Sequence, residues 1–194
     1  MTPPIVLTIG HSTRAITEFI RLLAAHQVQR VIDVRTIPRS RHNPQFNRAK
    51  LSPALRRARI YYRHIPGLGG LRRPRPDSTN TGWRNTSFRG YADYMQTPAF
   101  HKSLDRCIEL ATRERVVLMC AEAVPRRCHR SLIAHALLAR GIPTAEIASG
   151  KRVRPHVMPA WARVHGSQVT YPGEQVSSGG SADGTPAPTG SSAR

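Results

Sequence analysis

The densest group of reactive side chains lies between residues 120 and 130, in the segment CAEAVPRRCHR. Its ionisable and nucleophilic members are Cys120, Glu122, Arg126, Arg127, Cys128, His129 and Arg130. A thiolate is a strong nucleophile and a ligand for soft metals, and nearby arginines lower the pKa of a thiol because they stabilise the thiolate. The segment therefore predicts thiol, acid–base or metal chemistry, with a lowered pKa at Cys120 or Cys128.

This segment lies between a predicted strand and a predicted helix. The strand is the apolar run at 116–119, and the helix has apolar residues at helical spacing from 132 to 138 and ends before Gly141. Backbone N–H groups that are free at the end of a strand and the start of the next helix favour anions and thiolates. In α/β sheets this junction is the usual place for a ligand.

Two more strands are predicted near the N-terminus. The runs 5–9 and 31–35 are apolar and rich in β-branched residues, and the spacing between them predicts a helix capped by Thr17. A strand, a helix and a second strand within about 30 residues make a right-handed unit with parallel strands.

Polar residues follow both of these strands. They are His11 and Ser12 after the first strand, and Asp33, Arg35 and Arg39 at or beyond the end of the second. If both strands neighbour the strand at 116–119, these residues and the thiol segment meet at one edge of the sheet. Two alternatives stay open: His11 could be an exposed loop histidine, and Asp33 could cap a loop or pair with Arg35.

The middle of the chain is basic and less regular. It predicts a helix starting at Ser52-Pro53, a strand at 60–65, a glycine-rich turn at 66–70, a long basic loop at 71–89, and helices starting at Gly90 and Pro98. The turn could cradle a phosphate through backbone N–H groups or be a plain loop. Cys107 falls on an apolar helix face, which indicates a core thiol. The segment 142–147 predicts the last strand.

This alternation predicts an α/β fold that is Rossmann-like, with three layers, a mainly parallel sheet and helices on both faces. The length of 194 residues suits a single domain over residues 1–172. Residues 173–194 consist largely of Gly, Ser, Ala, Pro and Thr, which predicts a disordered tail.

The charge is extreme: 30 Lys and Arg against 11 Asp and Glu give a formal net charge of +19. Most of the cations are arginines, which bind phosphates and carboxylates bidentately and stack on bases. The expected partner is therefore an anionic substrate, such as a nucleotide or a nucleic acid. A GC-rich genome would also produce an arginine-rich composition, so the charge alone does not establish that the protein binds an anion.

The three cysteines form no disulfide framework, and neither a signal peptide nor a long apolar span is visible. These observations predict a cytoplasmic protein with reduced thiols and no membrane partner. No feature of the sequence sets an oligomeric state.

Five segments together resemble a known family. They are TIGHST, VIDVRTIPRSR, the PGLGG turn, GYADYM and VVLMCAEAVPRRCHR, the last followed by a helix and Gly141. In order and spacing they are similar to domain-of-unknown-function family 488 (DUF488), over residues 5 to 150. The resemblance implies a Rossmann-like α/β fold in which the His-Ser, Asp-Arg and Cys-Glu-Cys-His-Arg motifs gather at one site. It implies no established activity.

The first functional hypothesis is thiol chemistry. Cys120 and Arg126 have the Cys-x5-Arg spacing of cysteine phosphatases, and the order of strand, cysteine, loop and helix also resembles the rhodanese plan of sulfur transfer. Against both, the loop contains Glu122 and Pro125 and no glycine. A carboxylate repels an anion and a proline lacks an N–H donor.

A second hypothesis gives Glu122 the main role, as a general acid or base near His11 or His129. Three arginines would then hold an anionic substrate: Arg35, Arg39 and Arg130. The alternative is structural, because Glu122 could simply pair with Arg126 or Arg130 and fix the loop.

A metal site is a third hypothesis, since Cys120, Cys128, His129 and His11 offer ligands for zinc or iron. It is not favoured: the spacing fits no common zinc motif, and neighbouring side chains on a helix diverge by about 100°.

A fourth hypothesis is a nucleic-acid-binding protein without enzymatic activity. Its basic loops would grip the backbone, and Trp83, Tyr61 and Tyr62 would stack on bases. Polar motifs that converge at strand ends argue instead for a pocket with chemistry.

We therefore predict an enzyme, a hydrolase or group transferase, acting on a phosphorylated or nucleic-acid substrate. Its predicted catalytic residues are Glu122, Cys120, His11 and Asp33, and its predicted substrate-binding residues are Ser12, Arg35, Arg39, Arg126, Cys128, His129 and Arg130.

Overall fold

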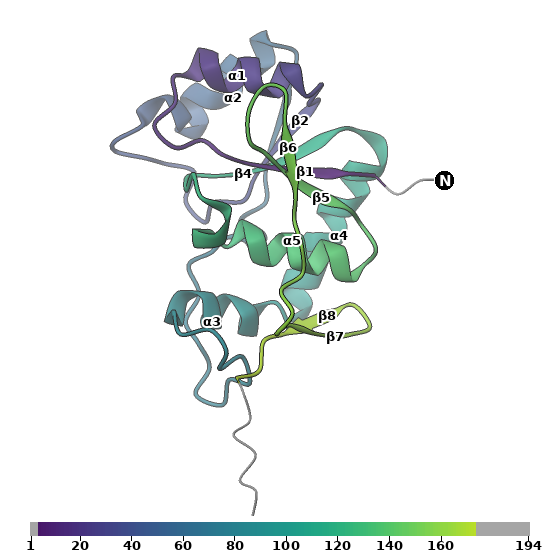
Figure 1. Ribbon diagram of the computed structural model, residues 1–194. Coiled ribbons are helices and arrows are strands. Elements are labelled where there is room, and N and C mark those ends of the chain that lie inside the picture. Colours follow the sequence, from purple (N-terminus) through teal and green to yellow (C-terminus); the bar gives the residue numbers. More distant parts are fainter. Residues whose placement is uncertain (1–3, 174–194) are drawn as a thin grey trace, which may run out of the picture.

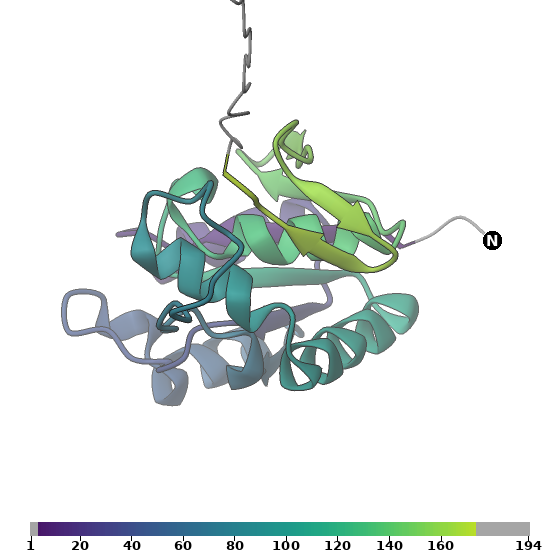
Figure 2. The ribbon, with the colours of Figure 1, turned by 90° about the horizontal axis from the view of Figure 1, so that it is seen from below.

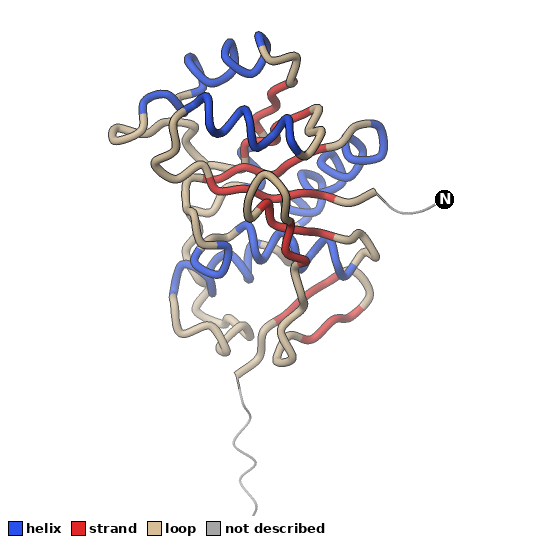
Figure 3. The backbone as a smooth tube through the Cα atoms, turned by 45° about the horizontal axis from the view of Figure 1, so that its top comes forward, coloured by secondary structure: helices blue, strands red, loops and turns tan. Residues whose placement is uncertain are grey.

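A computed structural model describes residues 4–173, so the predicted disordered tail lies outside the described residues except for Gly173. A six-stranded sheet forms the middle of the molecule (Figures 1 and 3). Its strands are β1 (Val6–Gly10), β2 (Arg30–Asp33), β3 (Tyr61–His64), β4 (Val116–Cys120), β5 (Thr144–Ile147) and β6 (Val153–Pro155). Their order across the sheet is β3-β2-β4-β1-β5-β6, and all neighbours are parallel except the β5–β6 pair.

The sheet is covered on both faces by helices. They are α1 (Ile16–Ala25), α2 (Arg48–Arg57), α3 (Thr86–Tyr94), α4 (Pro98–Arg113) and α5 (Arg130–Ala139). In Figure 1, α1 and α2 lie above the sheet, and α3, α4 and α5 lie below it. The fold is therefore α/β with a Rossmann-like layout, as the alternation of strands and helices predicts.

Each face of the sheet has its own apolar core. The β4 strand supplies both: Val117 and Met119 pack with α1 and α2, whereas Val116 and Leu118 pack with α4 and α5. All five β4 residues are buried, as the apolar run predicts for a strand covered on both faces. Among the core residues beneath the sheet is the thiol of Cys107, which is 0 % exposed, in agreement with its predicted place on the apolar face of a helix.

The predicted order of strands at the site is confirmed. The β4 strand lies between β1 and β2, with Gly10 opposite Cys120 and Asp33 opposite Met119. Because all three strands are parallel, their carboxyl ends meet at one edge of the sheet.

Three predicted helix starts are wrong. Ala15, not Thr17, caps α1. The α3 helix begins at Thr86 and not at Gly90, inside the predicted basic loop, because the side chain of Asn85 accepts hydrogen bonds from the N–H groups of the first helical turn. The α2 helix begins at Arg48 and contains Pro53 in its interior, where the missing N–H weakens it. Burial of the leucines on its inner face stabilises the helix despite the missing backbone hydrogen bond.

The predicted last strand is not the last. The chain after β5 turns back as β6, and β7 (Arg163–His165) and β8 (Gln168–Thr170) form a separate antiparallel hairpin. Figure 2 shows this hairpin lying across α5, where Val169 joins the lower core. None of the described helices is both long and apolar enough to cross a bilayer.

Candidate thiol pocket at the strand ends

A pocket of about 640 Å³ opens where β1, β2 and β4 end. Residues from five segments line it: His11 and Ser12; Arg35, Arg39 and Asn43; Gly70; Phe88; and Cys120, Glu122, Arg127, Cys128 and His129. The β-sheet edge and the start of α5 form one wall, and the loop after β2 forms another. The pocket is therefore at the junction where an α/β sheet favours ligands.

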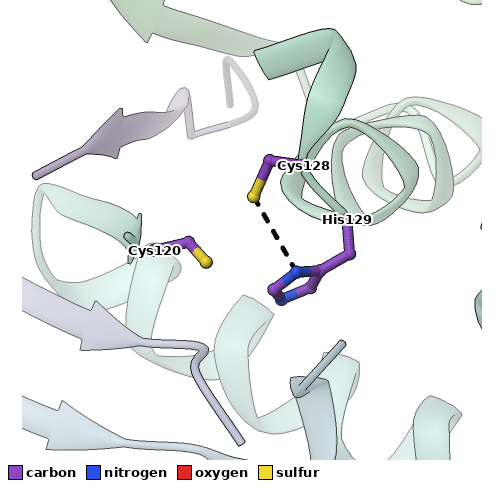
Figure 4. Close-up of side chains that lie close together, drawn as sticks. All are labelled: Cys120, Cys128 and His129. Carbon is purple, nitrogen blue, oxygen red and sulfur yellow. Dashed lines mark hydrogen bonds between the residues drawn. The ribbon is translucent and has the colours of Figure 1, made fainter. Parts of the chain in front are cut away.

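Two thiols and an imidazole lie together in this pocket (Figure 4). One ligand atom from each of Cys120, Cys128 and His129 lies within 4.8 Å of the others, and the Sγ of Cys128 is 3.8 Å from the Nδ1 of His129. Cys120 is the last residue of β4, while Cys128 and His129 immediately precede α5. Cys120 is 9 % exposed and Cys128 is 4 % exposed, so both sulfurs are largely shielded from bulk water.

The expectation that Cys128 and His129 diverge is wrong, because neither residue lies within the helix. Cys128 is extended, with φ −128° and ψ 140°, and helical geometry starts only at His129. The extended backbone turns the Cys128 sulfur towards the imidazole of its neighbour. This geometry removes the objection that adjacent residues cannot share a site.

The environment of the two thiols stabilises one negative charge. A hydrogen bond from Cys128 lowers the pKa of Cys120 far below its usual value, and nearby His129 and Arg130 favour the thiolate further. The pKa of Cys128 is raised in turn, because Cys120 holds its proton and burial disfavours a second charge. Cys120 is therefore the thiolate of the pair. Cys107 differs sharply, since burial alone raises its pKa to about 12.

The tautomer of His129 follows from its contacts. Its Nε2 lies 3.1 Å from the carbonyl oxygen of Val34, which can only accept, so Nε2 carries the proton. The Nδ1 atom then faces the two sulfurs: when protonated it favours the Cys120 thiolate, and when neutral its lone pair can accept a proton or bind a cation.

Asp33 and Arg35 form a buried support beneath the pocket. Arg35 makes a bidentate pair with Asp33, at 2.9 and 2.6 Å, and also donates to the Phe46 carbonyl at 2.8 Å. Tyr62 donates to the same carboxylate at 2.7 Å. Asp33 is 0 % exposed, so it orients Arg35 and does not face the pocket itself.

His11 is buried and not an exposed loop residue. Its Nδ1 donates to the Ser12 carbonyl at 2.8 Å, its Nε2 accepts from Arg35 at 3.3 Å, and its ring stacks on Phe46 with 4.1 Å between centroids. Burial lowers its pKa, so the ring is neutral. Ser12 beside it has a φ of 51°, an uncommon conformation for a residue other than glycine.

Glu122 was predicted as a general acid or base and Arg130 as a substrate-binding residue, but Glu122 is exposed at the rim of the pocket and Arg130 does not line the pocket. Glu122 is exposed at the pocket rim, where its carboxylate accepts from the Val124 N–H at 3.0 Å. Arg130 points away from the pocket: it is 0 % exposed and pairs with Glu146 at 3.3 Å. It also donates to the carbonyl of Glu122 at 2.6 Å, so it anchors the loop from below.

The loop between β4 and α5 differs from the anion cradle of cysteine phosphatases. The N–H groups of Val124, Arg127 and Cys128 all bond within the loop, and Pro125 has none. Arg126, at the Cys-x5-Arg position, lines a different cleft, and its neighbour Arg127 lines the thiol pocket. The pocket cations are therefore Arg39 and Arg127 at the rim and Arg35 at the base.

Two glycines permit close contacts that shape the site. A Cβ on Gly10 would lie 1.9 Å from the carbonyl oxygen of Glu122, and a Cβ on Gly70 would lie 2.5 Å from the Nδ1 of His129. The glycine-rich turn therefore packs against the imidazole ring of His129. Sequence reasoning did not assign Gly70 or Phe46 to the site, although three glycines within residues 67–70 were a signal of close packing.

The same three residues could hold a metal ion. Two thiolates and one imidazole are a donor set that zinc accepts, and the Nε2 contact of His129 with a carbonyl is typical of a metal-binding histidine. Tetrahedral ligation would require the three donor atoms to move closer together, and it would leave a fourth position open towards the pocket. Among the described residues, no other group of three such side chains is this close.

Comparison with known proteins places the sequence in one family. The family model described as "Domain of unknown function DUF488" matches residues 15–137, which includes α1, β4 and the segment from Cys120 to Arg130. No curated protein and no solved structure matches the sequence. The match spans more than half of the chain, and the chain therefore belongs to the DUF488 family.

Proposed function

We propose that this protein is a cysteine-dependent hydrolase or group transferase that acts on a small anionic, phosphorylated substrate. The observation that supports it is the placement of the Cys120 sulfur in the pocket, within 4.8 Å of the Cys128 thiol and the imidazole of His129. A buried thiolate beside a proton acceptor is the arrangement of an activated nucleophile.

In the proposed reaction the Cys120 thiolate attacks the electrophilic atom of the substrate. A bond forms from sulfur to that atom, the bond to the leaving group breaks, and the leaving group departs with the electron pair and takes a proton from water. Water or an acceptor hydroxyl then attacks the thio intermediate. Its proton passes to the Nδ1 of His129, and the thiolate leaves with the electron pair of the broken sulfur bond. His129 then gives that proton to the hydroxide left by the first step, which restores the starting state.

The cations at the rim define the proposed substrate class. Arg39 and Arg127 are exposed and line the pocket, and the described part of the chain provides no carboxylate partner for either. Guanidinium groups bind phosphate oxygens bidentately. Arg35 adds positive charge at the base, although its donors are already used by Asp33 and Phe46. Thiolate chemistry requires reduced cysteines, so the proposed location is the cytoplasm.

Two alkylating reagents test the site without knowledge of the substrate. At mildly acidic pH, Cys120 should react with iodoacetamide while Cys107 does not, as peptide mapping by mass spectrometry can show. The anionic reagent iodoacetate should be favoured at Cys120, and Arg127→Ala should reduce that preference about threefold or more. Arg126→Ala is the matched control, since Arg126 lines the other cleft and should leave the preference unchanged.

Turnover is then measured with p-nitrophenyl phosphate and a panel of phosphate monoesters. Activity that is lost in Cys120→Ser supports the proposal. Activity that persists in this variant, or a Cys120 no more reactive than Cys107, refutes it.

The 4.8 Å cluster supports a second candidate function, in which Cys120, Cys128 and His129 bind zinc. Elemental analysis of the purified protein, before and after dialysis against a chelator, distinguishes the two. Stoichiometric zinc that is lost in His129→Ala would support the metal site; metal-free protein with a reactive Cys120 would support the thiol enzyme.

A further inference from the structure

A second cleft, of about 650 Å³, lies on the other side of the loop between β4 and α5. Ala123 lines both cavities, while Arg126 lines only the second and Arg127 only the first. The end of β5, the segment after it and both tryptophans of the chain form the remaining walls. The proposed thiol reaction uses none of these walls.

The floor of the second cleft is a buried polar network. The side chain of Glu146 is 11 % exposed and that of His156 is 8 % exposed, and both face the cleft. Thr8 donates to Glu146 and lies 2.8 Å from the Nε2 of His156, and Arg130 pairs with the same carboxylate at 3.3 Å. The single hydroxyl proton of Thr8 is used by Glu146, so Thr8 can only accept from His156, whose Nε2 therefore carries the proton. This leaves the Nδ1 lone pair of His156 without a partner in the network.

A second histidine in the cleft also has a free ring nitrogen. The Nδ1 of His135 lies 2.8 Å from the hydroxyl of Tyr171, and no described residue bonds its Nε2. The residue as a whole is only 7 % exposed, yet it lines the cleft. A ring nitrogen that has no protein partner, on a residue that lines a cavity, is an available hydrogen-bonding position for a ligand.

An aromatic wall stands beside this polar floor. Trp161 makes edge contacts with Trp83 at 4.8 Å and tilted contacts with Tyr171 at 5.2 Å, measured between ring centroids. The backbone of Gly82 supports it too, because a Cβ there would lie 3.1 Å from the indole ring. Trp161 nevertheless stays 39 % exposed. It is therefore a rigidly held indole with open surface, which suits stacking against a planar ring.

Two arginines complete the cleft. Arg126 and Arg154 are exposed and line it, and in the described residues neither has a carboxylate partner. Arg14, the third, is already paired with Glu18 at 3.5 Å. The free positive charge therefore comes from Arg126 and Arg154, and it favours a ligand that carries phosphate.

We propose that this second cleft binds a mononucleotide. The base stacks on Trp161 and forms hydrogen bonds with the buried histidines, and the phosphate binds Arg126 and Arg154. A simple anion would make no use of the indole, and an apolar ring would leave the polar floor unsatisfied. A phosphorylated heterocycle matches all three features of the cleft.

Intrinsic fluorescence is a direct test, because both tryptophans of the chain line this cleft. The full chain is titrated with AMP, GMP, CMP and UMP, with correction for inner-filter absorption, and with ribose 5-phosphate and inorganic phosphate as ligands that lack a base. We expect saturable quenching by at least one mononucleotide. Affinity for the two base-free ligands should be at least tenfold weaker, because base stacking on an aromatic side chain is worth about tenfold.

Neighbouring arginines supply the matched variants. Arg126→Ala and Arg154→Ala should each weaken nucleotide binding about tenfold, as loss of a charged hydrogen bond predicts. Arg127→Ala, one residue away but in the thiol pocket, should bind as the wild type does. Arg126 and Arg154 are both exposed, so these variants should keep the fold.

The proposal is independent of the thiol mechanism, and Cys120→Ala should bind mononucleotides normally. It is overturned if no mononucleotide quenches saturably, if ribose 5-phosphate binds as well as the nucleotides, or if Arg127→Ala weakens binding as much as Arg126→Ala. That last result would locate the nucleotide in the thiol pocket instead.

Discussion

Replacing Cys128 by alanine removes the thiol that donates to the Cys120 sulfur, while replacing it by serine keeps a donor at the same position. We expect the pKa of Cys120 to rise in Cys128→Ala and to stay close to the wild-type value in Cys128→Ser. The comparison isolates the hydrogen bond, because both variants remove the second sulfur.

The size of the shift follows from the charge on the acceptor. A hydrogen bond to a charged group contributes about 1.5–3 kcal/mol, and one pKa unit corresponds to about 1.4 kcal/mol. Loss of the donor should therefore raise the pKa of Cys120 by about one to two units. His129 and Arg130 remain, so the thiol should still ionise below the usual pKa of about 8.5.

The assay is the rate of Cys120 alkylation by iodoacetamide as a function of pH, read by mass spectrometry on the Cys120 peptide. The rate rises with the thiolate fraction, so the midpoint reports the pKa. Circular dichroism at each pH verifies that the variants stay folded. Cys107→Ala is the control, because it deletes a core sulfur that lies outside the pocket and should not move the midpoint.

An identical midpoint in the alanine variant and the wild type would refute the reasoning. So would equal upward shifts in the alanine and serine variants, since the sulfur itself and not its hydrogen bond would then be responsible.

Three further predictions concern stability. Asp33→Ala leaves Arg35 buried and unpaired, and it should lower the free energy of unfolding in urea by about 3–5 kcal/mol; a change below about 1 kcal/mol would contradict the supporting role of the pair. Glu122→Gln alters an exposed carboxylate, so we expect a stability change within about 0.5 kcal/mol and an unchanged alkylation rate at Cys120. His135 and His156 have pKa values lowered to about 4 by burial, so the unfolded chain binds protons first as pH falls. These two histidines should make stability in urea fall as pH drops below about 6.5, by up to about 1.4 kcal/mol per pH unit per histidine down to about pH 4, in addition to the loss that the Cys120 thiolate causes as pH falls below about 8.5. Replacement of either histidine by glutamine should flatten that slope.

Most of the sheet was predictable because its signals are local. The β4 strand is an unbroken apolar run, and Gly141 has a φ of 72° just after α5, which explains why glycine ends that helix. Strand order was predictable in part, since right-handed parallel connections leave few arrangements. The helix starts at Ile16 and Arg48 were not, because burial against the sheet outweighed capping preference and the proline in α2.

The hairpin of β7 and β8 was missed for a related reason. Its strands have three residues each, and four of these six residues carry polar side chains that give no periodic signal. Its stability comes from one apolar residue, Val169, that reaches the lower core, together with the aromatic cluster around Tyr171. Contacts between residues so far apart in sequence leave no local pattern.

The sequence by itself determined which reactive groups the chain carries and that they follow neighbouring strands. Only the tertiary structure decided which way each side chain points. Arg126 and Arg127 are adjacent yet line different cavities, and Arg130 enters the interior to meet Glu146. The physical reason is that direction in an irregular loop depends on its hydrogen bonds and on the partners available nearby. Residue type and spacing along the sequence specify neither the hydrogen bonds of the loop nor the partners of its side chains.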